Sequence, residues 1–213
     1  MTDAQYYAQM KDLARTKREE YGIVTSKINI PLIQKIYKKE GIKIDRWKNV
    51  SRKIRAAYFC DGDDCSVLLN NSLPREPKLF SLVHELKHHF TDRSIIENGE
   101  IKCGDYNENK VIEIGAEVFA AEFIFPEEEM RKLISSLGIH KNNCEAKSVI
   151  TIKRMKIAPV SYMFIKKRFE FFGLIQSGAY DDVKFEKLEE EIHGKPFYEQ
   201  EWFKKQRKTK VSQ

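Results

Sequence analysis

The stretch FSLVHELKH, residues 80–88, decides the architecture because it joins an apolar helix to a candidate metal site. Residues four apart in an α-helix lie about 40° apart around the axis and about 6 Å apart along it. His84 and His88 therefore point the same way, and both imidazoles can bind one zinc ion. Glu85 lies beside the first histidine; in HExxH sites this glutamate faces a water molecule and accepts its proton. The pentapeptide alone also fits a helix with two surface histidines near a glutamate.

A catalytic zinc site needs a third protein ligand and one open position. The best source is the apolar segment 111–125, which ends before Pro126. Glu113 and Glu117 lie one turn apart on one face of this expected helix, beside two alanines that allow a close approach to the HExxH helix. A glutamate on that face is either near the zinc or a costly unpaired charge. Glu122 lies on a different face, and we expect it to see solvent.

The rest of the chain predicts further helices around a small sheet. Hydrophobic periodicity and end signals predict helices at residues 3–20, 31–40, 79–91, 111–125, from 126 onward, 147–155 and 160–172. Strands are expected at 42–47, 54–60 and 66–70, with an Asp-Gly turn between the last two that favours a hairpin. Residues 92–109 are expected to form a polar loop. The predicted class is α+β: a mainly helical, zincin-like domain with a small antiparallel sheet of about three strands.

Composition is that of a globular protein with a charged surface. Of 213 residues, 41% are hydrophobic and 33% are charged, and the formal net charge is +6. This excess favours weak attraction to nucleic acid or acidic partners without requiring either. The first twenty residues lack a signal-peptide pattern, and no apolar stretch approaches the roughly 20 residues that span a bilayer. We therefore expect a cytoplasmic protein that does not use a membrane.

The cysteines at positions 60 and 65 flank the expected hairpin turn. Cys60 and Cys65 could face each other and form a disulfide or half of a metal site. A zinc ribbon would need a second close pair, which the sequence lacks. Because a cytoplasmic location also keeps thiols reduced, the favoured interpretation is two small strand residues.

Two segments together resemble the ImmA/IrrE family of metallopeptidases. FSLVHELKH at 80–88 is similar to the family pattern FTLAHELGH, and EIGAEVFAAEFIFP at 113–126 is similar to ExxANxFAAxLLMP. The second motif is the more specific, and the resemblance covers about residues 28–175. It implies zinc ligands His84, His88 and Glu113, with Glu85 as general base in a gluzincin-like site. Members typically cleave a helix-turn-helix repressor, which releases phage, mobile-element or stress genes.

The resemblance also suggests how the chain is divided. We expect an N-terminal helical extension at 1–27, an ImmA/IrrE-like metallopeptidase domain at 28–176, and a charged C-terminal helix and tail at 177–213.

Two positions depart from the family pattern. Lys87 replaces a glycine, and we expect its long side chain to extend to solvent. Glu117 replaces an asparagine. It could hydrogen-bond to a ligand histidine without binding the metal itself, or it could compete as the third ligand. The motif alignment favours Glu113 as the ligand.

Several further features remain open from the sequence. The candidate oxyanion donors are His89, Tyr106 and Tyr58. Residues 146–173 are basic and could form a DNA-binding helix-turn-helix, although Tyr162, Ile165, Phe169 and Phe172 more simply form a buried stripe. The basic tail at 204–210 is more often a solvated end than a docking site.

The leading hypothesis is a cytoplasmic zinc endopeptidase that cleaves a helix-turn-helix repressor. One alternative is a regulatory protein that binds the repressor or DNA without cleavage. Another is a toxin-like peptidase with a paired antitoxin. Zinc is inferred from ligand type, since a site of two histidines and one glutamate also accepts Mn²⁺ and other divalent metals.

Overall fold

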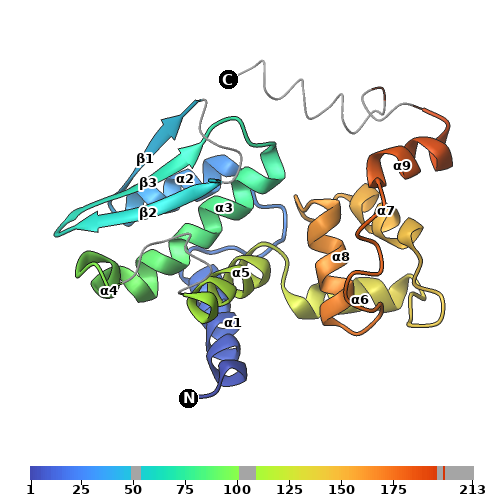
Figure 1. Ribbon diagram of the computed structural model, residues 1–213, viewed down its shortest axis with the longest axis horizontal. Helices are drawn as coiled ribbons and strands as arrows, with labels where there is room; N and C mark the ends of the chain where they lie inside the picture. The colour runs from blue at the N-terminus through green and yellow to red at the C-terminus, as the bar shows by residue number, and fades with distance from the viewer. Residues whose placement is uncertain (49–53, 101–108, 196–198, 200–213) are drawn as a thin grey trace. The chain divides into compact units, whose positions relative to one another are not determined.

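The computed structural model describes residues 1–48, 54–100, 109–195 and 199 (Figure 1). It consists of two compact units, Met1–Met130 and Arg131–Gln213. The mainly helical α+β class is confirmed, with one three-stranded sheet among the described residues. In these ranges no helix has both the length and the apolar character needed to cross a membrane.

The N-terminal unit begins with α1 (Asp3–Glu20), as the periodicity predicts. Thr2 and Gln5 form a reciprocal capping box that satisfies backbone N–H groups at its start. Met10, Ala14 and Arg18 are buried on the side of α1 that packs against α5 (Lys110–Ile124). This pairing brings the first twenty residues beside the helix that carries Glu113.

The helix α2 (Ile30–Lys39) is held by a side-chain cap at its N-terminus and by a hydrogen bond to α3 near its C-terminus. The side chain of Asn29 accepts a hydrogen bond from the N–H of Leu32 and caps the start of α2. The buried Tyr37 donates from its hydroxyl to the carbonyl of Leu82, at 2.7 Å. This bond holds α2 against α3 (Arg75–Lys87) beneath the sheet (Figure 1).

The sheet is mixed, which corrects the expectation of an antiparallel one. Its strands are β1 (Ile42–Trp47), β2 (Ala56–Asp61) and β3 (Asp64–Asn70), in the order β1-β3-β2. The expected hairpin is present, because β2 and β3 are antiparallel and Gly62 adopts φ 53° in the turn. β1 pairs with β3 and runs parallel to it. β3 is the central strand, and Cys65, Val67 and Leu69 are buried at alternating positions along it.

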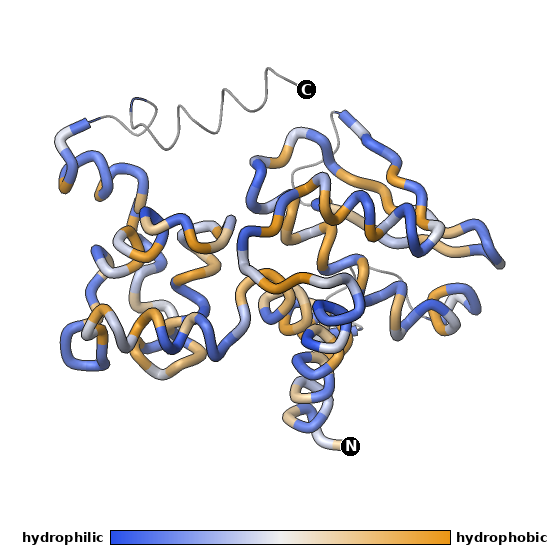
Figure 2. Tube along the Cα trace, turned by 180° about the vertical axis from the view of Figure 1, so that it is seen from behind, coloured by the Kyte–Doolittle hydropathy of each residue, from blue (hydrophilic) through white to orange (hydrophobic). Residues whose placement is uncertain are grey.

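The HExxH segment lies in α3, which begins earlier than expected. Pro77 looks like a loop residue in the sequence, but proline is tolerated in the first turn of a helix. After α3 the chain makes one π-helical turn, η1 (His88–Asp92), and then α4 (Arg93–Glu97). The expected loop from residue 92 is therefore partly helical, and residues 101–108 lie outside the described part. Figure 2 shows that hydrophobic and hydrophilic residues alternate along the helices.

The boundary between the two units falls within α6 (Glu127–Ser136). The C-terminal unit then contains α7 (Ala146–Met155), α8 (Tyr162–Phe171) and α9 (Phe185–His193). Its core includes Val149, Ile165 and Phe169. Glu189 of α9 is also buried, and it accepts hydrogen bonds from Tyr162 and Arg154, which attach α9 to the α7–α8 pair.

Candidate metal centre

Three buried side chains from two helices converge at one point. The Nε2 atom of His84 lies 3.1 Å from Oε2 of Glu113 and 3.2 Å from Nε2 of His88. The Nε2 atom of His88 lies 3.7 Å from Oε1 of Glu113. The two histidines come from the α3–η1 segment, and Glu113 comes from the first turn of α5. The structure thus brings together the three residues that the sequence predicts as ligands.

The spacing of these atoms suits a tetrahedral cation. Ligand bonds of about 2.0–2.1 Å in tetrahedral geometry separate the ligand atoms by roughly 3.3 Å. Every one of the three residues offers a ligand atom within 4.8 Å of the others, and all three are buried. The closest pairs lie at 3.1 and 3.2 Å, near the tetrahedral value. Two imidazoles and one carboxylate in this arrangement fit a divalent metal.

Asp92 holds the second nitrogen of His88. The Nδ1 atom of His88 lies 2.7 Å from Oδ2 of Asp92, one π-helical turn further along. A neutral His88 that donates from Nδ1 carries its lone pair on Nε2, the atom that faces the centre. Asp92 is not among the site residues predicted from the sequence, although its position four residues after a candidate ligand was a usable signal.

Lys87 is completely buried, so the expectation that it extends to solvent is wrong. Its ammonium donates to Oδ2 of Asp92 at 2.6 Å and to the carbonyl of Ile112 at 3.3 Å. The ring of Tyr6, from α1, lies 5.4 Å from the same nitrogen. Helices α1 and α5 therefore close the path by which this side chain would reach water.

Glu85 is buried beside the three converging residues. Its Oε2 atom has no hydrogen-bond partner in the described part of the chain, although it is inaccessible to solvent. Burial raises the pKa of Glu85 above its ordinary value, against the opposing effect of His84, His88 and a backbone hydrogen bond from Tyr58. A buried carboxylate oxygen without a protein partner is unusual, and it fits a place where a water or substrate group belongs.

The charge around His84 also favours a cation. Burial by itself lowers the pKa of His84, but its hydrogen bond to Glu113 and the charges of Glu85, Glu113 and Glu117 raise it above the ordinary value. Glu117 is only half-buried and stands outside the group of atoms within 4.8 Å of one another. The structure therefore places Glu117 near the centre as a source of negative charge.

Glu122 is 1% exposed, so the expectation that it sees solvent is wrong. Its carboxylate accepts from Nε of Arg15 at 3.0 Å and from the backbone N–H of Glu127 at 2.9 Å. The reason is that α1 packs against the face of α5 that was expected to be exposed to solvent. The same covering explains why Arg18 is buried and donates to the carbonyl of Phe123.

Two of the candidate oxyanion donors lie together. The hydroxyl of Tyr58 in β2 is 2.9 Å from Nδ1 of His89, which lies next to His88 in η1. Burial lowers the pKa of His89, so this ring is predominantly neutral near pH 7. The third candidate, Tyr106, lies outside the described residues.

Cys60 and Cys65 form a disulfide across the β2–β3 hairpin, so their interpretation as two separate reduced residues is wrong. They are direct partners in the strand register, with Cα atoms 4.1 Å apart. The hairpin tip is also attached to α4, because Gly62 donates to Glu97 and its carbonyl accepts from Arg93.

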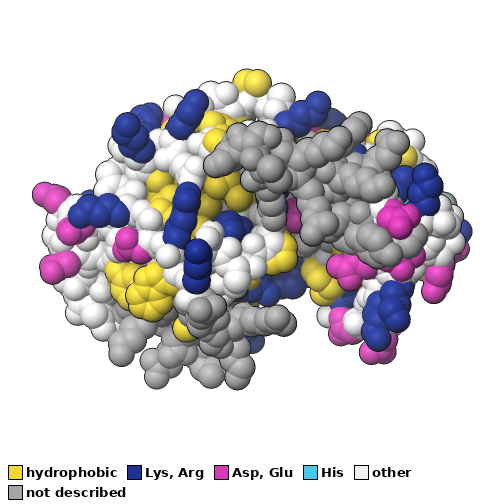
Figure 3. All heavy atoms as spheres, turned by 90° about the horizontal axis from the view of Figure 1, so that it is seen from above, with side chains coloured by type: hydrophobic (Ala, Val, Ile, Leu, Met, Phe, Trp, Pro, Cys, Tyr) yellow, Lys and Arg dark blue, Asp and Glu magenta, His cyan; other side chains and the backbone are white. Residues whose placement is uncertain are grey.

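The basic segment of the C-terminal unit does not present all its cations to solvent. Lys166 and Arg168 are buried. Three residues of the expected stripe, Tyr162, Ile165 and Phe169, are buried with them, whereas the fourth, Phe172, is half-buried. In the view of Figure 3, lysine and arginine side chains on the described surface are scattered rather than gathered in one patch. The basic tail at 204–210 lies outside the described residues.

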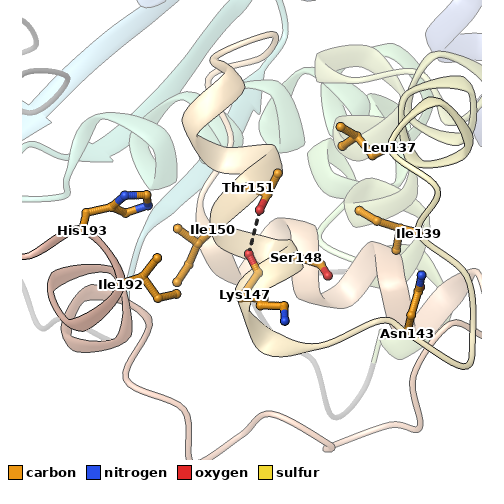
Figure 4. A pocket seen from close by; sticks show the side chains of 9 residues that line it. All are labelled: Leu137, Ile139, Asn143, Lys147, Ser148, Ile150, Thr151, Ile192 and His193. Carbon is orange, nitrogen blue, oxygen red and sulfur yellow. Dashed lines mark hydrogen bonds between the residues drawn. The ribbon is translucent and has the colours of Figure 1, made fainter.

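A separate cavity of about 340 Å³ opens in the C-terminal unit (Figure 4). Isoleucines 150 and 192, from α7 and α9, form part of its apolar lining. The remaining lining residues are Leu137, Ile139, Asn143, Lys147, Ser148, Thr151 and His193. None of the predicted site residues is among them, so the chemistry predicted from the sequence belongs to the N-terminal unit.

Comparison with known proteins points to one family. The model of Peptidase_M78, described as the IrrE N-terminal-like domain, matches residues 38–169, which is more than half of the chain. This range contains the triad, Glu85 and Asp92. A search of curated proteins finds no significant match.

Proposed function

Because this chain belongs to the IrrE N-terminal-like family of metallopeptidases, we propose that it cleaves a protein substrate with a zinc ion held by His84, His88 and Glu113. The observation that carries the proposal is the convergence of three buried ligand atoms beside Oε2 of Glu85, which has no hydrogen-bond partner among the described residues. When bound, the ion acts as a Lewis acid toward water and the scissile carbonyl.

Glu85 is the general base in this proposal. Its raised pKa follows from burial, and its position beside both histidines suits a group that takes a proton from water and passes it to the leaving amine. The backbone N–H of Tyr58 donates to the same carboxylate and restricts its orientation. Asp92 accepts a hydrogen bond from Nδ1 of His88, on the side of the ring away from the ion, and so fixes the orientation of that ring.

The proposed substrate is a helix-turn-helix repressor in the cytoplasm. The support is the resemblance of residues 80–88 and 113–126 to the ImmA/IrrE motifs, whose members typically act on such repressors. The family match supports proteolysis in general, and the substrate class is the finer part of the proposal.

The test is co-expression of the protein with a candidate helix-turn-helix repressor chosen from the genes that neighbour its own. Wild type should convert the repressor into two fragments, seen by intact mass, whereas Glu85→Gln should leave it whole while still binding zinc. The exposed carboxylate of Glu19 offers a control, and Glu19→Gln should cleave like wild type. Cleavage by Glu85→Gln at the wild-type rate would overturn the mechanism. Release of the repressed genes without any fragment would instead indicate regulation by binding.

A further inference from the structure

A fully buried ammonium stands behind the metal centre. Lys87 precedes His88 in the chain, contacts the first turn of α5 through Ile112, and is 0% exposed. It donates to Asp92 and to the carbonyl of Ile112, with the ring of Tyr6 nearby. Lysine is almost never fully buried without a partner, because its charge loses its hydration.

The contact with Asp92 connects Lys87 to His88. One oxygen of Asp92, Oδ2, is shared by the Lys87 ammonium at 2.6 Å and His88 Nδ1 at 2.7 Å. The other oxygen lies 3.0 Å from the hydroxyl of Thr91, whose one proton is shared with the carbonyl of Lys87 at the same distance. Both carboxylate oxygens are thus engaged, and the plane of the carboxylate that orients His88 is fixed.

Stability alone does not account for this arrangement. Replacing a buried ion pair by apolar groups of similar size is often neutral or stabilising, so burying Lys87 and Asp92 is not an efficient way to fill a core. The pair does supply a rigid acceptor for His88 Nδ1. Such partners of ligand histidines set the ring orientation and the affinity for metal.

We propose that Lys87 is a positioning residue of the metal centre: it fixes the Asp92 carboxylate, which in turn keeps Nε2 of His88 directed at the ion. This inference rests on the proposed metal site and adds a residue to its support. Without the ammonium, Asp92 keeps His88 and Thr91 as partners but gains freedom to turn, and the orientation of His88 loosens.

The test is a double-mutant cycle on zinc affinity, measured by competition with a chromophoric chelator. Lys87→Met keeps an unbranched apolar side chain that is one atom shorter, and removes the charge. It should weaken zinc binding by about tenfold, in the range seen when partners of ligand histidines are changed. It should also alter the visible absorption spectrum of the cobalt-substituted protein. In the Asp92→Asn background, Lys87→Met should cause no further loss, because it acts through Asp92.

Lys166 provides the matched control. It is also buried, at 3% exposure, and its ammonium pairs with Asp181 and Glu170 in the C-terminal unit. Lys166→Met should lower the thermal stability of the metal-free protein without changing zinc affinity or the cobalt spectrum. If Lys87→Met loses zinc affinity and Lys166→Met does not, the loss is not a general effect of removing a buried lysine.

Two results would overturn the inference: wild-type zinc affinity and cobalt spectrum in Lys87→Met, or additive losses in the cycle. If Lys87→Met does not fold, the double variant still tests the idea, because it leaves neither charge buried alone. Its zinc affinity should equal that of Asp92→Asn, and a tenfold weaker value would contradict the proposal. Failure of the wild type to bind zinc would instead refute the metal site itself.

Discussion

Nε2 of His84 and Oε2 of Glu113 lie 3.1 Å apart although 29 positions separate them in the sequence. This relationship joins α3 to α5 at the centre of the site. It depends on the close packing of the two helices, which Ala116 and Ala120 permit because both are small and fully buried. Glu117, one turn later, is turned partly to solvent.

The first prediction separates the two glutamates. Glu113→Gln should weaken zinc binding by at least about tenfold, because it removes a charged oxygen from the triad. Glu117→Gln should change the affinity much less, since it removes only nearby charge. Chelator competition on both purified variants measures this difference. A larger loss in Glu117→Gln would assign the third ligand to Glu117.

The second prediction concerns the contact between α1 and α5 at Gly115. A Cβ atom on Gly115 would lie 2.5 Å from Cε1 of Tyr6, so Gly115→Ala should cost about 1–3 kcal/mol of stability through overpacking. In a Tyr6→Ala background the same change should become neutral or stabilising by up to about 1 kcal/mol, because alanine favours helix more than glycine does. Urea unfolding of the four proteins tests this reversal; equal costs in both backgrounds would exclude the clash.

The third prediction concerns the hairpin disulfide. Cys60 and Cys65 close a short loop with a sequence separation of 5, so breaking the bond should cost about 2 kcal/mol by the chain-entropy relation. A thiol reductant should therefore lower the melting temperature of wild type. The variant Cys60→Ser/Cys65→Ser should melt at one temperature with or without the reductant. Peptide mass spectrometry without prior reduction detects the bridge directly, and alkylation of both cysteines in that experiment would refute it.

The fourth prediction concerns Cys144 in the C-terminal unit. Burial raises the pKa of its thiol from 9.0 to about 11. A thiol with a raised pKa favours the folded state below the unfolded pKa, and this contribution is lost as pH rises from about 9 through 11. At pH 8 the thiolate fraction of Cys144 should be up to about a hundredfold lower in the folded protein than in the unfolded chain. The rate at which iodoacetamide alkylates Cys144 should be lower by the same factor. An alkylation rate with its midpoint near pH 9 in the folded protein would contradict this.

The local pattern of the sequence predicted most of the secondary structure. β1 was expected at 42–47 and is found at Ile42–Trp47, and α1 and α5 differ from the expected ranges by at most one residue at each end. These elements carry strong periodicity or clear end signals. The parallel direction of β1 was missed because a local pattern does not show which strand it pairs with, and β1 pairs with β3 rather than with β2.

The candidate site was predicted in its ligands but not in its surroundings. His84 and His88 could be proposed because helical spacing is fixed by geometry, and Glu113 was favoured over Glu117 by the resemblance to the family motif. Lys87 and Glu122 were misjudged for one common reason. Their burial depends on α1 packing against α5, a contact between segments about one hundred residues apart that no local pattern records.

The packing of α1 has a consequence for recombination between relatives. The family match begins at residue 38, yet α1 supplies Tyr6, Arg15 and Arg18 to the back of α5. Gly115 and Glu122 suit this particular helix. A chimera that exchanged only the matched region would join a foreign α5 to these side chains, so α1 and α5 should be exchanged as one block.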